Sequence, residues 1–535
     1  MKRNIITACY CLILASLVTC IFSCKKDEQQ LEAPRIFKVS GMKVVVSENS
    51  AKLTWTAPLF KEGNKYSYTI DFSTDTLFSK TDFSAQTDTT GYTVKEGDLK
   101  LRERYFARVK VNATATQPES KYIVGPGSFK IVGTQRFLEE ITIARENSVT
   151  LFFSAVEEGA KIVITPEAGA AITTSLNSAD IAANKITIGG LSNSTKYTAE
   201  LFTGVKSSGF TSFSTTAAIV YSIKVNPGDN LATIIASAAD NAIIGLENGT
   251  YELPAVITLA GKTINLRSVN DNPELVKVNF KGFTLLGSGA GLTVAGINFD
   301  GTAYTATYFC DLTSASSNTA AAAFKNVKAT NSWIHGINTS IIRCDRGSLF
   351  TMEDLAFDNC LIYEISGANY YVFHMDKLAY KSLTVTNSTF YNISPGLVSC
   401  RTVMPGTPAT ITISNSTINN IGFNSNYLLM NAAANPVNFV FKNSILANGP
   451  RSGAVLGIIN STAAAASIAF TNNNTFNLKT AIGGTALPLP GASTQGQTVD
   501  PGWNAGTVKF ILPEGSILRT SSSTGRAVGD PRWTF

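Results

Sequence analysis

The chain has 535 residues, of which 44% are hydrophobic, and it carries 44 Lys and Arg against 38 Asp and Glu. One ordinary hydrophobic core does not organise a chain of this length, so we expect about three domains. The net charge of +6 is mild, and no basic run or basic helix follows the N-terminal leader. These features argue against a nucleic-acid-binding protein.

The N-terminus has the pattern of a secretory leader. Met1-Lys2-Arg3 precedes an apolar run, Ile5 to Phe22, that ends too soon to be a membrane span. The run closes on Ile21-Phe22-Ser23-Cys24, which resembles a bacterial lipobox. This resemblance implies that residues 1–23 are a lipoprotein signal peptide and that Cys24 becomes the lipidated first residue of the mature chain.

The residues after the cut predict where the mature protein lies. Lys25-Lys26-Asp27-Glu28, within the segment 24–30, resembles the surface-export tag of Bacteroidetes lipoproteins. The resemblance implies a protein held by its lipid on the outer face of the outer membrane. Cys20 is a weaker lipidation candidate, because Thr19 is bulkier than Ser23 at the position before the cut. An uncleaved membrane anchor is the remaining alternative.

Two strand-rich segments come next, residues 31–132 and 133–217, with short alternating runs separated by turns. In both, a Leu precedes a Tyr by six residues, as Leu99 precedes Tyr105 and Leu191 precedes Tyr197. The spacing resembles the tyrosine corner of fibronectin type III sandwiches. It implies two fibronectin type III-like domains, which we interpret as a spacer. Trp55 is expected in the core of the first, with stacking on a carbohydrate as the alternative.

The character of the chain changes after Ser222. Asp229 to Ala242 predicts an amphipathic helix, with Leu231, Ile235 and other apolar residues on one face. An Asn-Gly-Thr-Tyr turn and alternating apolar residues follow it. We expect this helix to cover the end of a stack of strands, which would otherwise expose its core.

The main signal is a repeated Asn. Asn359, Asn387, Asn415 and Asn443 are each 28 residues apart, and a weaker copy ends at Asn472 or Asn473. A constant period of this length indicates stacked supersecondary units, and the period-two alternation within each unit indicates strands. Asn tolerates a left-handed backbone in a turn, and stacked Asn amides can bond one another as a ladder.

This pattern resembles the right-handed parallel β-helix of the pectate lyase-like superfamily. The resemblance covers residues 218–535 and makes the whole chain all-β: two fibronectin-like sandwiches, then a parallel β-helix with a capping helix. The lyase signatures of that superfamily are absent, since Trp333-Ile334-His335 is only a fragment of one. We interpret the closing Gly529-Asp530-Pro531-Arg532-Trp533 as a cap or tail. The four downstream cysteines lack metal-site spacing and are expected in the core.

The superfamily places its active groove on the first strand of each coil, which points to candidate site residues. Strand alternation turns Cys344, Met375 and Cys400 inward and their neighbours outward. We therefore expect a file on successive coils, roughly 5 Å apart, with one slip in register between coils. The file itself is expected to contain Asp345, Asp376 and Arg401. Arg343, His374 and Ser399 should lie beside it, and Lys377 at the end of a strand. On the fourth coil, Leu429 and Asn431 should continue this surface.

These residues could support elimination on a uronate polymer. Cations acidify the proton beside the substrate carboxylate, and a base removes it. The lyase interpretation assigns Arg401, Lys377 or His374 as the base and Arg343 as a further cation. Asp345 and Asp376 would hold a metal, Ca²⁺ in the lyase-like version.

Charge is unevenly distributed along this half of the chain. Residues 377–499 contain six Lys and Arg and no Asp or Glu, which predicts a positive field that attracts an acidic polysaccharide such as a pectic polymer. Exposed aromatics could add a sugar platform. The candidates are Tyr370, Tyr371, Tyr380, Tyr391 and Tyr427.

Four functions stay open from the sequence. The first is a polysaccharide lyase, and the second is a non-catalytic surface glycan-binding protein that works with other proteins of a polysaccharide-utilisation system. A polygalacturonase-type hydrolase would have only Asp345 and Asp376 as its carboxylates, and a structural or adhesive role is the fallback. A groove over Asp345, Asp376 and Arg401 would favour an enzyme, and a flat open face would favour binding.

Overall fold

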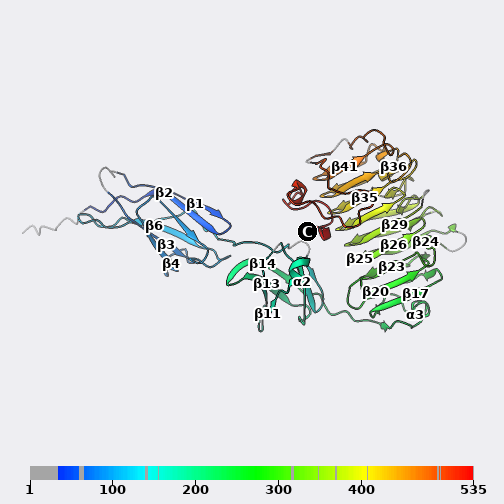
Figure 1. Cartoon of the computed structure of the whole chain (residues 1–535), viewed down its shortest axis with the longest axis horizontal. Coiled ribbons are helices and arrows are strands. Elements are labelled where there is room, and N and C mark those ends of the chain that lie inside the picture. Colours follow the sequence, from blue (N-terminus) through cyan, green and yellow to red (C-terminus); the bar gives the residue numbers. More distant parts are fainter. Residues whose placement is uncertain are drawn as a thin grey trace, which may run out of the picture. The chain divides into compact units, whose positions relative to one another are not determined.

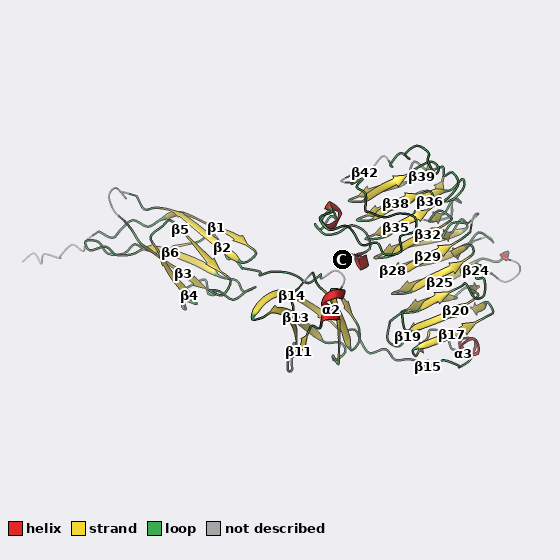
Figure 2. Ribbon diagram, viewed as in Figure 1, coloured by secondary structure: helices red, strands yellow, loops and turns green. Residues whose placement is uncertain are grey.

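The structure is a computed structural model that describes residues 34–533, except 60–64, 139–141, 155, 315–317, 347–348, 368–369, 407, 491–492 and 495. The leader and Cys24 lie outside the described residues. The chain forms two compact units, the second of which begins its main segment at Thr215 (Figures 1 and 2). Among the described residues, no helix has the length and apolarity needed to cross a membrane.

The N-terminal part of the chain forms two antiparallel β-sandwiches with the same strand order. Each combines a three-stranded sheet and a four-stranded sheet, which is the arrangement of a fibronectin type III domain, as predicted. The first sandwich has the sheets β1 (Ser40–Ser47), β2 (Ser50–Thr56), β5 (Gly91–Lys95) and β4 (Phe83–Thr87), β3 (Tyr68–Ser73), β6 (Phe106–Val111), β7 (Ile123–Val124). The second has β12 (Lys185–Gly189), β9 (Ser148–Phe152), β8 (Ile143–Ala144) and β11 (Ile172–Ser175), β10 (Lys161–Pro166), β13 (Lys196–Thr203), β14 (Lys206–Ser214), with the short helix α2 (Ser178–Ala183).

The core of the first sandwich contains the residues that the sequence places there. The Tyr105 hydroxyl accepts a hydrogen bond from the backbone N–H of Lys100, 3.2 Å away and next to the buried Leu99. This is the local contact expected of a tyrosine corner. Trp55 is buried against Tyr68, with ring centroids 5.4 Å apart. Trp55 is therefore a core residue and is not available for stacking on a sugar.

The second unit is a parallel β-helix built from three sheets, because each coil adds one strand to each sheet. Sheet 1 contains β15 (Ile223–Val225), β16 (Ala242–Leu246), β19 (Thr263–Ser268), β22 (Gly291–Ala295), β25 (Ala322–Thr330), β28 (Phe350–Asp358), β31 (Leu378–Thr386), β34 (Ala409–Ser414), β37 (Val437–Lys442), β40 (Ser467–Thr471) and β42 (Ser493–Thr494). Sheet 2 contains β17 (Gly249–Leu253), β20 (Val276–Phe280), β23 (Asn298–Asp300), β26 (Trp333–Ile337), β29 (Leu361–Ile365), β32 (Thr389–Ile393), β35 (Thr417–Ile421), β38 (Ile445–Gly449) and β41 (Asn474–Leu478). Sheet 3 contains β18 (Ile257–Ala260), β21 (Phe283–Leu286), β24 (Tyr308–Thr313), β27 (Ser340–Arg343), β30 (Phe373–His374), β33 (Val398–Ser399), β36 (Tyr427–Ala433) and β39 (Gly457–Ser461).

The repeated Asn forms the turn between a sheet 1 strand and the next sheet 2 strand. Asn359, Asn387, Asn415 and Asn443 all have φ between 47° and 53°, the left-handed conformation expected of them. The amides bond one another less regularly than a continuous ladder would. Asn359 donates to the Asn331 side chain at 3.1 Å, but Asn387 donates to Asp358 and Asn443 to Ser523. The predicted ladder of Asn amides is thus interrupted, because some of these amides donate to a nearby Asp or Ser instead of to the next Asn.

A second left-handed position, which the sequence analysis missed, lies near the end of the sheet 2 strands from β29 to β41. Asn392, Asn420, Asn448 and Asn477 occupy it with φ between 52° and 57°, and Glu364 occupies it one coil earlier with φ 55°. The Asn448 amide donates to Asn419 and the Asn477 amide to Asn448, both at 2.8 Å. From Glu364 to Asn448 these positions are 28 residues apart, and Asn477 follows after 29, so the repeat sets two bends in each of these coils.

Replacing Glu364 by Asn should stabilise the β-helix by about 1 kcal/mol, because a residue with a long side chain is strained in the left-handed region and Asn is not. The measurement is the denaturant midpoint of the β-helix transition. The control is Glu353→Asn, since Glu353 is also exposed but lies in the extended strand β28. The strain argument fails if both variants shift the midpoint equally.

Each end of the β-helix is covered. Helix α3 (Leu231–Ser237) is shorter than predicted, because Ala242 already begins β16, but it buries Leu231 and Ile235 against the first coil. At the other end, residues 479–487 fold over the last coil and bury Leu487. The closing segment Gly529 to Trp533, predicted to be a cap or a tail, is a tail. We call residues 499–533 the C-terminal strap, which includes the 3₁₀ turns η2 (Ile517–Arg519) and η3 (Pro531–Trp533).

Candidate functional site

Sheet 3 brings most of the predicted site residues together. Its register pairs Arg343 with His374 and His374 with Ser399, as expected, including the slip in coil length. The alternate residues Cys344, Met375 and Cys400 point inward and are at most 1% exposed. Cys310 and Cys360 are also buried, and all four cysteines are free, so they are core residues.

The predicted register of the fourth coil is wrong by two residues. Asn431 pairs with Ser399, not with Arg401, and Leu429 is buried instead of facing outward. The cause is visible in Leu428-Leu429-Met430, where three consecutive apolar residues give no alternation from which to set the register. The file of expected site residues therefore ends at Arg401.

Arg343 lies at the centre of a buried charge cluster. Its guanidinium contacts Asp345 at 2.6 Å and Asp311 at 3.4 Å. The guanidinium carbon lies 5.5 Å from the ring centroids of Tyr308 and of Tyr370. Arg343 is only 7% exposed. It therefore neutralises neighbouring carboxylates and has little surface with which to contact a substrate.

The sequence analysis missed Asp311. It lies in β24, one coil before Arg343, and pairs with it in the sheet. Arg346 also contacts its carboxylate, at 2.9 Å. Burial raises the pKa of Asp311 to about 6, although Arg343 opposes this shift. Extending the aligned strands one coil toward the N-terminus would have found this residue.

His374 is buried between two carboxylates. Its Nε2 lies 3.5 Å from Asp345 and 3.7 Å from Asp376, and the side chain is 3% exposed. Nδ1 accepts a hydrogen bond from the backbone N–H of Tyr371 at 3.4 Å. Burial lowers the pKa of His374 despite the two carboxylates, so the ring is neutral at neutral pH. With Nδ1 engaged and the proton on Nε2, His374 has no free lone pair with which to act as a base.

Asp376 and Arg401 form the outer part of the site. The Asp376 carboxylate accepts hydrogen bonds from Ser399 Oγ at 2.6 Å and from Arg401 Nε at 2.7 Å and its backbone N–H at 2.9 Å. Burial disfavours its charge, but these bonds outweigh burial and lower the pKa of Asp376. Arg401 keeps 52% of its side chain exposed. Its bond with Asp376 raises the pKa of Arg401, which is unfavourable for a base.

Lys377 and the five tyrosines of the predicted sugar platform differ in exposure. The Lys377 side chain is exposed, and its backbone N–H bonds Cys344. Tyr371 and Tyr380 are buried, contrary to the predicted platform. Tyr380 belongs to the main core of the β-helix, and the Tyr371 hydroxyl accepts a hydrogen bond from the backbone N–H of Tyr427 at 2.8 Å. Tyr370 and Tyr427 keep partial exposure, and Tyr391 lies under Phe510 of the strap.

The residues fit calcium poorly. Asp345 and Asp376 are already paired with Arg343 and Arg401, whereas Ca²⁺ takes about six to eight oxygen ligands. Among the residues that the structure describes, no group of three or more His, Cys, Asp or Glu is placed to hold a metal ion. The metal role of the two aspartates stays a prediction, and no chemical step is derived through it.

Three comparisons with known proteins bear on the chain. Residues 249–393 match a family model described as a domain of unknown function, DUF4957. No curated protein matches the sequence. Solved structures similar to the chain include the FN1-FN3 domains of chicken CNTN1, with 13% identity, TM-score 0.17 and coverage of 35% of this chain and 69% of that one. Another is a two-domain fibronectin type III segment of chicken tenascin, with 14% identity, TM-score 0.16 and coverage of 33% and 97%.

Proposed function

We propose that the outer face of sheet 3 binds a uronate-containing polysaccharide without cleaving it. The observation that carries this proposal is Arg401, whose guanidinium is half exposed and oriented by the buried Asp376. An oriented guanidinium recognises a carboxylate through paired hydrogen bonds. Exposed Lys377 follows Asp376 directly, and the next carboxylate in the chain is Asp500. A parallel β-helix is also compatible with proteins that act on polysaccharides.

Non-catalytic binding is favoured over elimination because two of the candidate bases are unsuitable. His374 has no free lone pair, and the Arg401 pKa is raised. The second candidate function is a lyase with Lys377 as its base, since Lys377 is exposed beside the cluster. In either case, a lipid on Cys24 and the two sandwiches as a spacer would hold this face outside the outer membrane, where it would meet the polymer and other polysaccharide-utilisation proteins.

Affinity electrophoresis of the leaderless protein through gels containing polygalacturonate or alginate tests the proposal. Arg401→Ala should weaken retention about tenfold or more, equivalent to about 1.4 kcal/mol, because an ionic hydrogen-bonded contact is lost. Arg401→Lys should retain part of the affinity through its charge. The matched control is Lys325→Ala, since Lys325 is exposed on sheet 1. Higher salt should weaken retention of the wild-type protein.

The two candidate functions give different results. Absorbance at 232 nm, which reports unsaturated uronate, should stay flat with and without calcium or chelator. A rise that Lys377→Ala abolishes would replace the binding proposal with the lyase. Failure of the wild-type protein to be retained by any uronate polymer, or equal retention of the Arg401→Ala and Lys325→Ala proteins, would reject this face as a uronate site. Circular dichroism should first establish that each variant is folded.

A further inference from the structure

The C-terminal strap runs back along the outside of sheet 2, beside coils that precede it in the sequence. It starts at the last coils, where Val499 exchanges two hydrogen bonds of 2.9 Å with the Asn474 side chain. Gly529 then donates to the Asn443 carbonyl at 2.8 Å, and Arg532 reaches Asn359. Between Asn474 of β41 and Asn359 before β29, the strap therefore returns past four coil-to-coil steps of sheet 2.

Apolar side chains fix the middle of the strap. Phe510 is fully buried, and its ring centroid lies 5.5 Å from Tyr391 of β32 and 5.1 Å from Trp503. Trp503 and Leu518 of the strap join Ile445 and Ala447 of β38 in one buried cluster. The strap thus has its own hydrophobic core against the β-helix.

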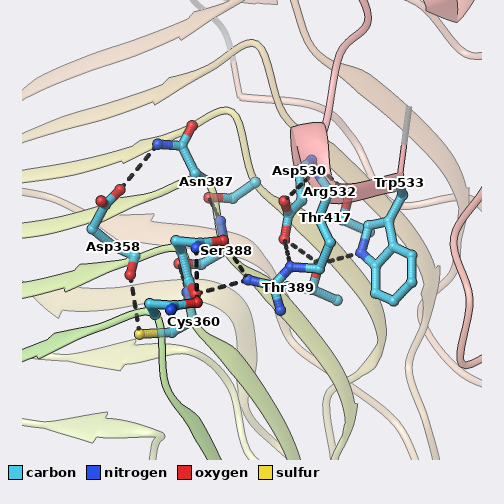
Figure 3. Close-up of polar contacts among 12 residues, drawn as sticks. Asp358, Cys360, Asn387, Ser388, Thr389, Thr417, Asp530, Arg532 and Trp533 are labelled. Atoms are coloured by element: carbon cyan, nitrogen blue, oxygen red, sulfur yellow. Dashed lines mark hydrogen bonds and ion pairs between the residues drawn. The ribbon is translucent and has the colours of Figure 1, made fainter. Parts of the chain in front are cut away.

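Hydrogen bonds fix the last residues of the strap (Figure 3). The Asp530 backbone N–H donates to the Thr417 hydroxyl at 2.9 Å, and its carboxylate accepts from the Thr389 hydroxyl at 2.7 Å. Trp533 Nε1 donates to Thr389 Oγ1 at 2.6 Å. Arg532 donates to the Asn359 carbonyl at 2.8 Å and to its side-chain oxygen at 2.7 Å.

These contacts span separate coils. Asn443 precedes β38, Thr417 begins β35, Thr389 begins β32, and Asn359 precedes β29. Thr389 and Thr417 are paired neighbours in sheet 2, so the strap contacts equivalent positions of successive repeats. Asp530 itself is 3% exposed, and Arg532 and Trp533 are half-buried.

We propose that residues 529–533 are a latch that slows unfolding of the β-helix from its C-terminal end. In a stacked repeat, each coil contacts only its neighbours, so opening can begin at one end and spread. A segment that joins four successive coils must be released before the coils next to it can separate. The latch can form only after those coils exist. It therefore contributes little to the folding transition state and acts on the unfolding rate.

The test uses the full mature chain carrying Arg532→Ala and Trp533→Ala together. The unfolding rate of the β-helix after a jump into denaturant should rise at least tenfold, while the refolding rate should change less than twofold. The control is Lys509→Ala, since Lys509 is an exposed strap residue, and its rates should match the wild-type rates. Hydrogen exchange should become faster in β34, β37 and β40 and change little in β19 and β22.

Two further measurements keep the proposal testable if the double variant folds poorly. Trp533→Phe keeps an aromatic ring but loses the N–H that bonds Thr389, so it should also speed unfolding, by a smaller factor. A synthetic peptide of residues 521–533, added to the double variant, should restore slow unfolding, whereas a scrambled peptide should not. Unfolding rates within twofold of wild type in the double variant, or slower refolding in proportion to faster unfolding, would overturn the latch.

Discussion

Replacing Arg343 by Met should destabilise the β-helix by about 3–5 kcal/mol, because breaking a buried ion pair leaves its partner charges unpaired in a poorly solvated site. Arg343 is 7% exposed and lies between Asp311 and Asp345. Methionine keeps much of the side-chain volume, so the loss should report charge more than packing. The measurement is the free energy of unfolding of the β-helix from denaturant titration.

The matched control is Arg346→Met. Arg346 also contacts Asp311, but 38% of its side chain is exposed. A pair of this kind contributes little, so the control should cost less than about 1 kcal/mol. Equal losses in the two variants would show that burial of the Arg343 guanidinium does not decide its contribution. Restoration of stability by adding Asp311→Asn to Arg343→Met would support the charge argument.

The second large effect is a pH dependence that Asp311 introduces. Its pKa is raised to about 6, above the ordinary Asp value near 3.9, so the unfolded carboxyl ionises first as pH rises. Stability from this group is complete below about pH 4 and is lost as the pH rises through 6. The shift of about two units corresponds to at most about 3 kcal/mol at neutral pH.

The measurement is the free energy of unfolding of the wild-type protein minus that of Asp311→Asn, followed from pH 7 to pH 5. The difference should grow by about 1.3 kcal/mol between pH 7 and pH 5, because only about one pH unit of this window lies below the raised pKa. The subtraction is needed because the lowered pKa of His374 acts in the opposite direction: the unfolded ring binds its proton first, so stability falls below about pH 6.5. A difference that does not change with pH would contradict the raised pKa of Asp311.

The repeat of Asn made much of the fold predictable. A left-handed turn suits Asn better than most residues, so one residue type at a constant spacing set the phase of sheets 1 and 2. The second bend escaped notice because Glu364 breaks its pattern in the coil where the repeat begins. The strap could not be predicted in detail because its sequence has no period, and its partners such as Asn359 and Thr389 are far away in the chain.

The candidate site was predictable as a gathering of residues but not in its accessibility. Strand alternation correctly set Arg343 and His374 on the outer side of sheet 3. It could not reveal that Tyr308 and Tyr370 approach the Arg343 guanidinium, because side chains from neighbouring coils and loops cover these positions. The pairing of Asp376 with Arg401 could be predicted from the register of the coils alone. The burial of Arg343 and His374 could not, because it depends on how the loops fold over them.

The slip in sheet 3 shows that the spacing of sheet 3 strands along the chain can vary while the length of a whole coil stays constant. His374 follows Arg343 by 31 residues (374−343), and Ser399 follows His374 by only 25 (399−374), yet together these intervals equal two repeats of 28. Over the same coils, sheets 1 and 2 advance by 28 each time. A longer loop before a sheet 3 strand is therefore offset by a shorter loop after it. The loops before and after a sheet 3 strand can therefore differ in length from coil to coil, while sheets 1 and 2 keep every coil in phase with the next.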